Sequence, residues 1–307
     1  MNVLVTGANG FVGSHLCAYL AGKDIACRRA VRCREGVGPD ATEVGEIDGT
    51  TDWTRALAGI TVVVHLAARV HVLREKALDP LAEFRRVNVE GTAGLARQAA
   101  AAGVRRFIFL STIKVNGEET STRPFAPDDR PAPVEPYSIS KLEAEEALRV
   151  IARETGLELV ILRPPLVYGR GVAGNFARLV RLVRQGWYLP LGSVRNRRSL
   201  LGVENLCSLL TLCLAHPGAA NKVLLASDGQ DVSTPDLVRG IAQVCGVAPR
   251  LLPLPVALLQ LLAGLCGRGP EMRRLTGSLQ IDISRTSTLL GWQPPLTLAQ
   301  GLRQCVE

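Results

Sequence analysis

Tyr137 and Lys141 are the two residues whose types and spacing most clearly predict chemistry. They stand four positions apart at the start of a segment with helical character, so both side chains lie on one face of that helix. A free phenol has a pKa of about 10, and we expect the ammonium of Lys141 to lower the pKa of Tyr137 toward neutral pH. The pair therefore predicts a proton carrier, which takes or returns the proton of a substrate hydroxyl while a hydride moves to or from a nicotinamide.

Two hydroxyl residues precede this helix in the sequence, at the end of an apolar run. Ser111 and Thr112 follow Phe109 and Leu110, which we interpret as the end of a strand. Because the ends of parallel strands meet at one edge of a sheet, both hydroxyls are expected at the edge where ligands bind. Thr112 is predicted to hold the reacting oxygen, with Ser111 as its neighbour or substitute in contacting the substrate. Lys141 is also predicted to hold the ribose of the nicotinamide.

The elements that must position these groups alternate between short β-branched runs and alanine-rich helical segments. This alternation predicts a parallel sheet covered by helices on both faces, which is a doubly wound α/β fold. The stronger strands are continuous apolar runs, as burial on both faces requires. The predicted strands are Val3–Thr6, Ala26–Val31, Glu43–Ile47, Val62–Ala67, Arg106–Ser111 and Leu159–Arg163, and the predicted helices are Gly13–Leu20, Leu81–Ala102 and Tyr137–Glu154.

A glycine-rich turn, Thr6–Gly13, joins the first predicted strand to the first predicted helix. Gly7 permits the tight turn, Gly10 lets backbone amides approach a pyrophosphate, and Gly13 lets the helix pack against the strand. The N-terminus of the helix then faces the phosphates. This context predicts a dinucleotide site, whose contacts from the turn are Gly7, Asn9, Gly10, Phe11, Val12 and Gly13.

The end of the second predicted strand bears on which dinucleotide binds. NAD-binding proteins commonly place an acidic residue there for the ribose hydroxyls, whereas this chain offers basic residues, with Arg32, or else Arg29, as the best placed. An arginine fork suits a ribose 2′-phosphate, so NADP is the predicted cofactor and NAD the alternative; a solvated arginine fits the sequence equally well. Further cofactor contacts are predicted at Asp48, against the adenine edge, and beneath the cofactor at Leu66, Ala67 and Ala68.

The rhythm of strands and helices breaks after about Tyr168, where an arginine-rich stretch begins and Pro and Gly become frequent. A helix at Val203–Leu214 and one more strand at Lys222–Ala226 are still predicted. We therefore expect residues 1–169 to bind the dinucleotide, with a segment near 201–226 returning to them, and residues 170–307 to form a smaller mixed α/β substrate lobe. That lobe is predicted to pack on the carboxyl edge of the sheet, where ligands of open α/β sheets bind.

The charge balance limits the partners. The chain has 307 residues, with 36 Lys and Arg against 28 Asp and Glu, so its net charge is 36 − 28 = +8. This suits an anionic ligand; nucleic acid is the weaker interpretation, because aromatic residues do not interleave the arginines as stacking on bases requires. Eight scattered cysteines, without a CxxC pair or a histidine at zinc spacing, predict reduced thiols, no metal site and a cytoplasmic location.

The apolar stretch Leu251–Cys266 is the strongest candidate for contact with a membrane. Pro253 and Pro255 break its start, and the rest is shorter than the roughly 20 residues that a spanning helix needs, so no integral membrane segment is predicted. A buried helix is expected; the alternative is a helix that rests on the membrane surface, which the lack of a basic polar face disfavours. The start of the chain has no basic region before its glycine turn, which disfavours a secretory signal.

The motifs of the chain form a larger set than the turn and the Tyr–Lys pair. They are TGxxGxxG at Thr6–Gly13, HLAA at His65–Ala68, NVxGT at Asn88–Thr92, the run Ser111–Gly117, YxxxK at Tyr137–Lys141, RPPLVYG at Arg163–Gly169, Gly174–Phe176, Asn196–Ser199 and Gly277–Gln280. This set resembles an extended short-chain dehydrogenase/reductase of the nucleotide-sugar epimerase/dehydratase branch, over nearly the whole chain. The likeness is greatest to UDP-sugar 4-epimerases and UDP-N-acetylquinovosamine 4-dehydrogenases (4-ketoreductases) of bacterial surface polysaccharide synthesis.

The resemblance implies roles for further residues. Asn175 and Arg198 would contact the diphosphate of a UDP-linked sugar, and Asn88 would support the catalytic helix from behind. The resemblance also implies a homodimer and a Rossmann-type cofactor domain. Two departures from the pattern of the family stand out: the acidic residue of NAD-retaining epimerases after the second strand is missing, and Asn116 stands where many 4-epimerases carry a tyrosine.

The leading functional expectation is an NADP(H)-linked enzyme that acts at C4 of a UDP-linked hexosamine or 6-deoxyhexosamine, with Tyr137 as proton donor to a 4-keto sugar. The alternative is a UDP-sugar 4-epimerase, in which the cofactor stays bound while the keto sugar turns over. A dehydratase is disfavoured, because that branch has an acidic pair after the strand-end threonine, where this chain has Ile113 and Lys114. A non-catalytic NADP-sensing protein would also fit the fold, but the full set of Thr112, Tyr137 and Lys141 argues against it.

Overall fold

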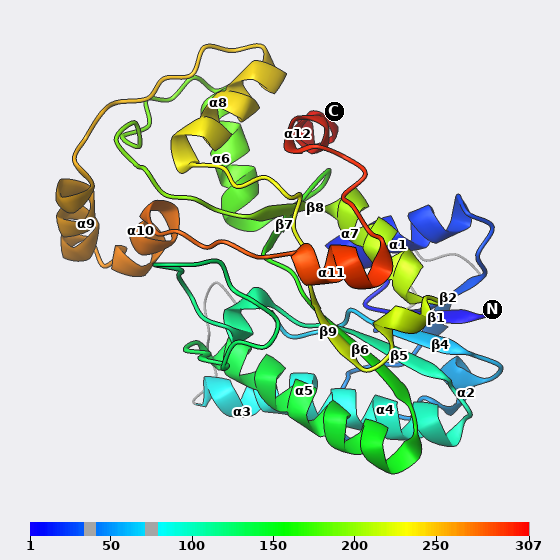
Figure 1. The fold of residues 1–307 in the computed structure, drawn as a ribbon. Helices are drawn as coiled ribbons and strands as arrows, with labels where there is room; N and C mark the ends of the chain where they lie inside the picture. Colours follow the sequence, from blue (N-terminus) through cyan, green and yellow to red (C-terminus); the bar gives the residue numbers. More distant parts are fainter. Residues whose placement is uncertain (34–40, 71–78, 307) are drawn as a thin grey trace.

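Seven parallel strands form one sheet in the computed structural model, which describes residues 1–33, 41–70 and 79–306 (Figure 1). The order of the strands across this sheet is β3-β2-β1-β4-β5-β6-β9. The doubly wound α/β fold that the alternation of elements predicts is therefore confirmed. The strands are β1 (Val3–Thr6), β2 (Cys27–Val31), β3 (Ala41–Glu43), β4 (Val62–His65), β5 (Arg106–Leu110), β6 (Glu158–Arg163) and β9 (Lys222–Leu225).

Beside β1, successive strands change the side of the sheet on which they are added: β2 and β3 lie on one side of β1, and β4, β5, β6 and β9 lie on the other. Strand β1 pairs with β2 on one side and with β4 on the other, so that Thr6 lies opposite both Ala30 and His65. The connections after β1 and β4 leave in opposite directions, and the carboxyl ends of these two strands border a crevice. Ligands of doubly wound sheets bind at such a switch point, so this is where the predicted cofactor residues must meet.

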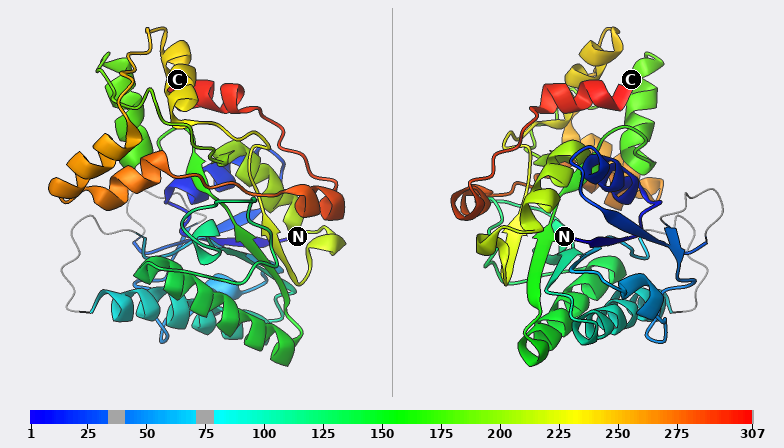
Figure 2. Two further views of the ribbon diagram at one scale, coloured as in Figure 1. Left: turned by 60° about the vertical axis from the view of Figure 1, so that its left-hand side comes forward. Right: turned by 90° about the vertical axis from the view of Figure 1, so that its right-hand side faces the viewer.

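Helices cover both faces of the sheet (Figure 2). Strand β1 shows how the sequence directs this, because Val3 and Val5 pack into one helical layer while Leu4 packs into the other. The first layer contains α1 (Phe11–Ala21), α7 (Val203–Cys213) and α11 (Ser284–Leu290), and the second contains α2 (Thr54–Leu57), α3 (Pro80–Arg85), α4 (Thr92–Ala101) and α5 (Pro136–Thr155).

The third strand lies earlier in the chain than the prediction of Glu43–Ile47. The N–H of Val44 donates the last ladder hydrogen bond to Val31 O (2.9 Å), and Gly45 then turns the chain with a φ of 69°. Because a residue with positive φ cannot continue a strand, β3 ends at Glu43.

The long helix predicted at Leu81–Ala102 is present but divided. A π-helical segment, η1 (Arg86–Gly91), separates α3 from α4. A Cβ on Gly91 would lie 2.6 Å from Ile47 Cγ2, so this turn packs closely on the loop after β3. Segments of π-helix are frequent at functional sites, and this one contains Asn88.

The chain enters a C-terminal lobe directly from the carboxyl end of β6 (Figure 1). Two short parallel strands and several helices pack there around a separate apolar core, in which buried Tyr168 donates to Asp228 Oδ2 (2.7 Å). Short 3₁₀ turns, η2 (Ile113–Val115) and η3 (Pro217–Ala219), lie outside this lobe. The elements of the lobe are β7 (Leu166–Tyr168), β8 (Leu200–Gly202), α6 (Gly174–Arg184), α8 (Thr234–Cys245), α9 (Val256–Leu265), α10 (Gly269–Thr276) and α12 (Leu298–Val306).

Helix α9 corrects the expectation that Leu251–Cys266 forms a buried helix. It lies at the outer end of the lobe (Figures 1 and 2), and Leu259 and Ala263 are its only buried residues. Its side chains project from a helix that touches the protein on one side, so apolar composition alone does not decide burial. The described helices include none that is both long and apolar enough to cross a membrane.

Candidate active site

The glycine turn after β1 is as tight as its spacing predicts. Gly7 has a φ of 64°, and a Cβ on this residue would lie 2.8 Å from Ala67 N. A Cβ on Gly13 would lie 2.1 Å from Gly7 O, so α1 can approach the turn only with glycine at this position. The turn thereby brings the residues after β4 against the end of β1.

The start of α1 has the properties of a phosphate site. Its N-cap is Gly10, no side chain caps it, and its first turn contains no acidic residue. The backbone N–H groups of Phe11 and Val12 therefore have no side-chain acceptor, and the positive end of the helix dipole faces outward. Asn9 and Gly10 are exposed beside them. These residues fit the pyrophosphate of a dinucleotide.

His65 has a structural role beneath this site. Its Nδ1 lies 2.7 Å from Thr6 Oγ1 and its Nε2 lies 2.9 Å from Thr92 Oγ1. Burial lowers the pKa of His65 to about 3, so the imidazole is neutral at neutral pH. Thr6 Oγ1 also accepts the N–H groups of Leu66 and Ala67, at 3.2 Å each. These bonds fix residues that are predicted to lie beneath the cofactor.

The arginines at the end of β2 have different surroundings. Arg28 is used within the protein, because its Nη1 donates to the carbonyls of Ala56 (2.9 Å) and Ala58 (2.8 Å). Arg32 is exposed, and its Nε lies 3.4 Å from Glu46 Oε1. An exposed ion pair of this kind contributes little stability, so Arg32 keeps its charge available to a ligand. Its contact with a ribose phosphate stays a prediction.

Asp48 lies in a turn after β3. Its Oδ1 accepts the N–H and the hydroxyl of Thr50, both at 2.8 Å, and these hydrogen bonds lower the pKa of Asp48. The carboxylate is therefore ionised and partly engaged by its own turn. Its predicted contact with the adenine is not tested by this geometry.

Tyr137 and Lys141 lie one turn apart on α5. The helix starts with Pro136 in its first turn and with a capping box between Glu135 and Ser138. This start fixes where the first turn begins, and Tyr137 is thereby placed within it. Both residues therefore lie in one helix, as their spacing of four positions predicted.

Asn88 connects the π-helical segment to α5 and to the loop after β4. Its Nδ2 donates to Ser140 Oγ (3.0 Å) and to Arg69 O (3.0 Å), and its Oδ1 accepts the N–H of Arg69 (2.8 Å). Ser140 Oγ in turn donates to Tyr137 O (2.8 Å). The buried amide therefore lies behind the turn that carries Tyr137, which is the place that the resemblance implies for it.

Lys141 is buried, with 2% of its surface exposed. Its Nζ lies 3.9 Å from the centroid of the Phe109 ring, and no described residue accepts a hydrogen bond from it. Burial lowers the pKa of Lys141 to about 7, and the nearby Glu145 carboxylate opposes that shift. A buried ammonium with hydrogen-bond donors left over fits the ribose hydroxyls of a dinucleotide.

The pKa of Tyr137 differs from the sequence-based expectation. Burial raises it to about 12, whereas Lys141 was expected to lower it. The reason is that both groups are buried together, and burial disfavours the phenolate and the ammonium alike. In the free protein Tyr137 is therefore a neutral phenol that can donate a proton.

The two hydroxyls after β5 serve different purposes. Thr112 is half-buried, and its Oγ1 accepts the N–H of Lys114 (3.3 Å), which leaves its own proton for a substrate oxygen. Ser111 is buried, and its Oγ donates to Glu145 Oε1 (2.6 Å). The predicted contact of Ser111 with the substrate stays a prediction, because in this structure its hydroxyl proton is donated to Glu145. Ser111 follows Phe109 on the strand face that packs on α5, as the period of two requires.

A buried ion pair below Lys141 was not found from the sequence. Glu145 is completely buried, and Arg163 at the end of β6 donates to both of its oxygens (2.8 and 2.5 Å). Arg163 also donates to Asn116 Oδ1 (2.9 Å). Asn116, which stands where many 4-epimerases carry a tyrosine, is thereby held inside the protein. The spacing of four between Lys141 and Glu145 was the available signal.

Arg198, a predicted substrate contact, lies in a segment of the lobe that its own contacts hold in place. The segment that carries it makes isolated bridges to Val232 and Leu279, and its Nη1 donates to Gly277 O (3.0 Å). The side chain is half-buried, which lowers the pKa of the guanidinium although the Glu119 carboxylate lies near it. Asn175, the other predicted substrate contact, is exposed in the first turn of α6.

Glu135 links the start of α5 to the lobe. One carboxylate oxygen accepts from Lys114 Nζ (2.5 Å), and the other accepts from Arg274 of α10. Lys114 also lies 3.2 Å from Glu118. The sequence analysis did not single out Glu135 or Arg274, because their contact joins residues far apart in the chain. The Glu-Pro start of the helix was the available signal for Glu135.

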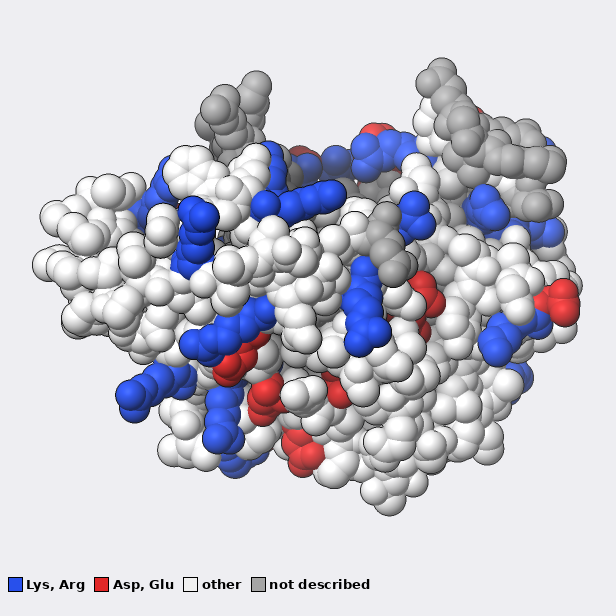
Figure 3. Space-filling view, turned by 90° about the horizontal axis from the view of Figure 1, so that it is seen from above, with Lys and Arg blue, Asp and Glu red and all other residues white. Residues whose placement is uncertain are grey.

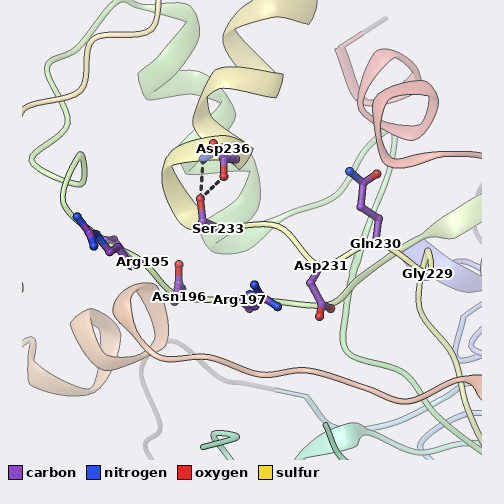
Figure 4. Close-up of a pocket in the computed structure, with 9 residues that line it drawn as sticks. Arg195, Asn196, Arg197, Gly229, Gln230, Asp231, Ser233 and Asp236 are labelled. Atoms are coloured by element: carbon purple, nitrogen blue, oxygen red, sulfur yellow. Dashed lines mark hydrogen bonds between the residues drawn. The ribbon is translucent and has the colours of Figure 1, made fainter. Parts of the chain in front are cut away.

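A cavity of about 650 Å³ lies within the lobe, between Val194–Arg197 and the start of α8 (Figure 4). Asp231, Ser233 and Asp236 line its other side. None of the residues predicted for catalysis or cofactor binding lines it. Asn196, which lines the cavity, and Arg198 both donate to Gly277 O, at 2.9 and 3.0 Å. The cavity therefore adjoins the segment that carries Arg198.

The comparison with known proteins places the chain in a family. The sequence profile of the NAD dependent epimerase/dehydratase family matches residues 3–225. This chain belongs to that family. It is an enzyme of the nucleotide-sugar epimerase/dehydratase type, and the resemblance drawn from its motifs is confirmed. The alternative of a non-catalytic NADP-sensing protein is therefore set aside.

Individual relatives cover the whole chain. A UDP-glucose 4-epimerase of Vibrio cholerae is 46% identical over 313 residues, which cover 100% of this chain and 94% of that protein. An N-acetyl-alpha-D-glucosaminyl-diphospho-ditrans,octacis-undecaprenol 4-epimerase of Escherichia coli O157:H7 is 27% identical, with the same coverage. The structure of MoeE5 in complex with UDP-glucose and NAD superposes with a TM-score of 0.79, at 26% identity, over 100% of this chain and 97% of that one.

The cofactor of the family agrees with the glycine turn. The family is described as NAD dependent, and MoeE5 holds NAD. The sequence analysis left NADP and NAD open, with NADP preferred because of Arg32. The glycine turn and the family both support a dinucleotide site. The preference for NADP stays a prediction.

Proposed function

We propose that this enzyme is a UDP-sugar 4-epimerase, acting on UDP-glucose or UDP-N-acetylglucosamine and their 4-epimers. One observation carries the proposal: Tyr137 and buried Lys141 lie one turn apart at the start of α5, in a chain that is 46% identical over its whole length to a UDP-glucose 4-epimerase. The sequence analysis ranked a 4-ketoreductase first. The relatives reported above favour the epimerase, which was the alternative.

The residues of the site have distinct tasks in such a reaction. A bound NAD supplies the hydride acceptor and, when oxidised, a positive charge that favours the phenolate of Tyr137. Tyr137 takes the proton of the 4-hydroxyl and returns it after the 4-keto sugar has turned over. Thr112 donates a hydrogen bond to the same oxygen, and Lys141 holds the ribose beside it.

The diphosphate of the substrate requires a separate anchor, because the sugar must turn over while its carrier stays bound. Arg198 and Asn175 of the lobe supply it in this proposal, since an arginine fork suits phosphate oxygens. Both relatives reported above are named as 4-epimerases of sugars carried on a diphosphate. A diphosphate held by the lobe is therefore the common part of the substrate.

An interconversion assay tests the proposal. The purified enzyme, incubated with UDP-galactose and catalytic NAD, should form UDP-glucose, as chromatography of the nucleotide sugars detects, without net formation of reduced nicotinamide. UDP-N-acetylgalactosamine is assayed in parallel. Stoichiometric consumption of NADPH with a 4-keto sugar, without interconversion of the four UDP-sugars, would instead identify a 4-ketoreductase and overturn the proposal.

Three further properties of the enzyme are part of this proposal. Mass spectrometry of the dinucleotide that copurifies distinguishes NAD from the NADP that Arg32 predicts. A homodimer is expected from the family resemblance, and sedimentation velocity of the purified protein measures it. Retention of one dinucleotide through many turnovers is expected of an epimerase, because the same hydride returns to the sugar.

A further inference from the structure

Helix α9 carries an apolar face that the proposed function does not use. Leucines recur on it at intervals of three, four and seven residues, which places them on one stripe of the helix. Their exposed fractions range from 40% to 79%. Contiguous exposed apolar surface is limited on most monomeric proteins, and larger patches of it commonly mark interaction sites. We call this stripe, with the exposed leucine before the helix, the α9 surface: Leu252, Leu258, Leu261, Leu262 and Leu265.

Most of the charged residues that flank the α9 surface are basic. Residues 251–267 contain no charged side chain. Exposed Arg250 and Arg268 stand at the two ends of this uncharged stretch, and exposed Arg273 lies on α10, which packs against α9. Glu271 is the one acidic residue of α10. In Figure 3 the end of the molecule that α9 forms is largely white, with blue side chains beside it.

Two exposed aromatic residues lie near the same end of the lobe. Trp187 is 60% exposed and Tyr188 is 62% exposed. The next residue, Leu189, pairs with the segment before α9 through its N–H to Arg250 O (2.8 Å), and the Arg250 guanidinium lies 5.2 Å from the centroid of the Tyr188 ring. Trp and Tyr beside cations are enriched where proteins meet the headgroup region of a bilayer.

We infer that the α9 surface docks onto an anionic lipid bilayer, with its leucines among the headgroups and Arg250, Arg268 and Arg273 on the lipid phosphates. Interfacial helices bind in this way, through apolar area together with attraction to anionic lipids. A helix of this length rests on the bilayer and does not span it. The basic face that the sequence of α9 lacks is supplied by the residues that flank it.

A second copy of the chain is a poorer occupant of this surface. A two-fold contact through α9 would bring each copy's Arg250 and Arg268 close to those of the other copy, because such a contact uses the same patch twice. Like charges brought together at an apolar contact oppose association. Lipid phosphates, in contrast, neutralise the same arginines.

Vesicle sedimentation of the full-length enzyme tests the inference. Wild type should sediment with vesicles of phosphatidylcholine mixed with phosphatidylglycerol, and much less with phosphatidylcholine alone. The double variant Leu261→Ser/Leu265→Ser should bind at least about tenfold more weakly, since it removes apolar contact. The control Val134→Ser/Val150→Ser changes two exposed apolar residues elsewhere and should bind as wild type does.

The arginines are tested separately. Arg268→Gln/Arg273→Gln should weaken binding to the anionic vesicles roughly fivefold per arginine, and added salt should reduce the difference. The control Arg97→Gln/Arg153→Gln lowers the net charge equally at exposed positions on α4 and α5. Tryptophan emission gives a second readout, because Trp187 is exposed whereas Trp53 and Trp292 are buried; vesicles should shift its emission to shorter wavelength.

Three results would overturn the inference. They are the absence of sedimentation with anionic vesicles at low salt, equal binding of the leucine variant and wild type, and loss of a dimer in sedimentation velocity on changing the leucines, which would assign the surface to self-association. Turnover of dissolved UDP-sugars should be the same in all these variants. The inference and the proposed epimerase activity therefore fail independently.

Discussion

Two carboxylates, Glu135 just before α5 and Glu145 in the middle of that helix, both form ion pairs, but one is partly exposed and the other is buried. Glu145 is completely buried and bonds to Arg163 and Ser111. Glu135, just before the helix, is part-exposed and bonds to Lys114 and Arg274. The first set fixes the helix on the sheet. The second joins the helix to the lobe, where water screens the charges.

The difference lies in how much each set of ion pairs should contribute to the stability of the protein. Tyr137 and Lys141 lie between the two carboxylates along the chain, so both sets of contacts flank the turn of α5 that carries them. A buried ion pair is costly to break, whereas an exposed one contributes little. Changes along this one helix should therefore have very unequal effects, and four predictions measure them.

The largest effect is expected at the residue between the two sets. Tyr137→Phe should lower kcat by about 10²–10⁴-fold, which is the usual contribution of general acid–base catalysis. Dinucleotide binding should be unchanged, because the glycine turn and Lys141 remain. Steady-state kinetics and a dinucleotide titration measure the two quantities. Retention of wild-type kcat would contradict the assignment of the phenol as proton carrier.

Of the substitutions at the two carboxylates, Glu145→Gln should be more destabilising than Glu135→Gln. Loss of one partner leaves the buried Arg163 guanidinium unpaired, which costs about 3–5 kcal/mol in the free energy of unfolding. Denaturant unfolding measures it. The neighbouring Glu146→Gln is the matched control, since Glu146 is exposed and should change stability little. Equal stability of the two variants would show that the buried pair does not fix α5.

The stability of the ligand-free enzyme should rise with pH above neutrality. The pKa of Lys141 is lowered to about 7 by burial, against 10.5 in an ordinary environment, so the unfolded chain holds more protons than the folded one between these values. Stability therefore increases with pH across that window. Above about pH 10 the sign reverses for Tyr137, whose pKa is raised to about 12.

Lys141→Met isolates this contribution. Denaturant unfolding at several pH values should show a rise from neutral pH toward pH 10 in wild type that is absent from the variant. The comparison removes the effect of the other groups that titrate in the same range. Parallel curves for the two proteins would mean that Lys141 is charged in the folded state throughout.

The smallest effect is expected from Glu135→Gln. The amide keeps the size of the side chain and removes the charge that Lys114 and Arg274 share, at a cost of about 0.2–1 kcal/mol in the free energy of unfolding. The KM for the UDP-sugar should change more than kcat. Glu154→Gln, an exposed position at the other end of α5, is the control. A stability loss as large as that of Glu145→Gln would contradict the difference between the exposed and the buried carboxylate.

The strands and the turn were predictable because their signals are local. Strand β1 was predicted with its observed bounds from a continuous apolar run, and the glycine spacing of Gly7, Gly10 and Gly13 gave the turn after it. The spacing of Tyr137 and Lys141 likewise depends on one helix. Such features follow from residues within one or two turns of each other.

The features that the sequence did not predict depend on which helices and strands pack against each other. The contact between Glu145 and Arg163 requires β6 beside α5, and the contact between Glu135 and Arg274 spans 139 positions. The raised pKa of Tyr137 follows from burial, which no spacing reports. The exposure of α9 follows from its place at the outer end of the lobe, so an apolar segment was mistaken for a buried one.

The position of β9 in the sheet has a consequence for the order in which the chain can fold as it is synthesised. Strand β6 pairs with β5 on one side and with β9 on the other, and Leu290 and Trp292 complete the apolar layer over α7. Until residue 225 has emerged, β6 is an unpaired edge that invites pairing with another chain. A protein truncated after Gly169 would keep that edge permanently. The sheet formed by the first 169 residues therefore needs β9, from the last third of the chain, to cover the edge of β6.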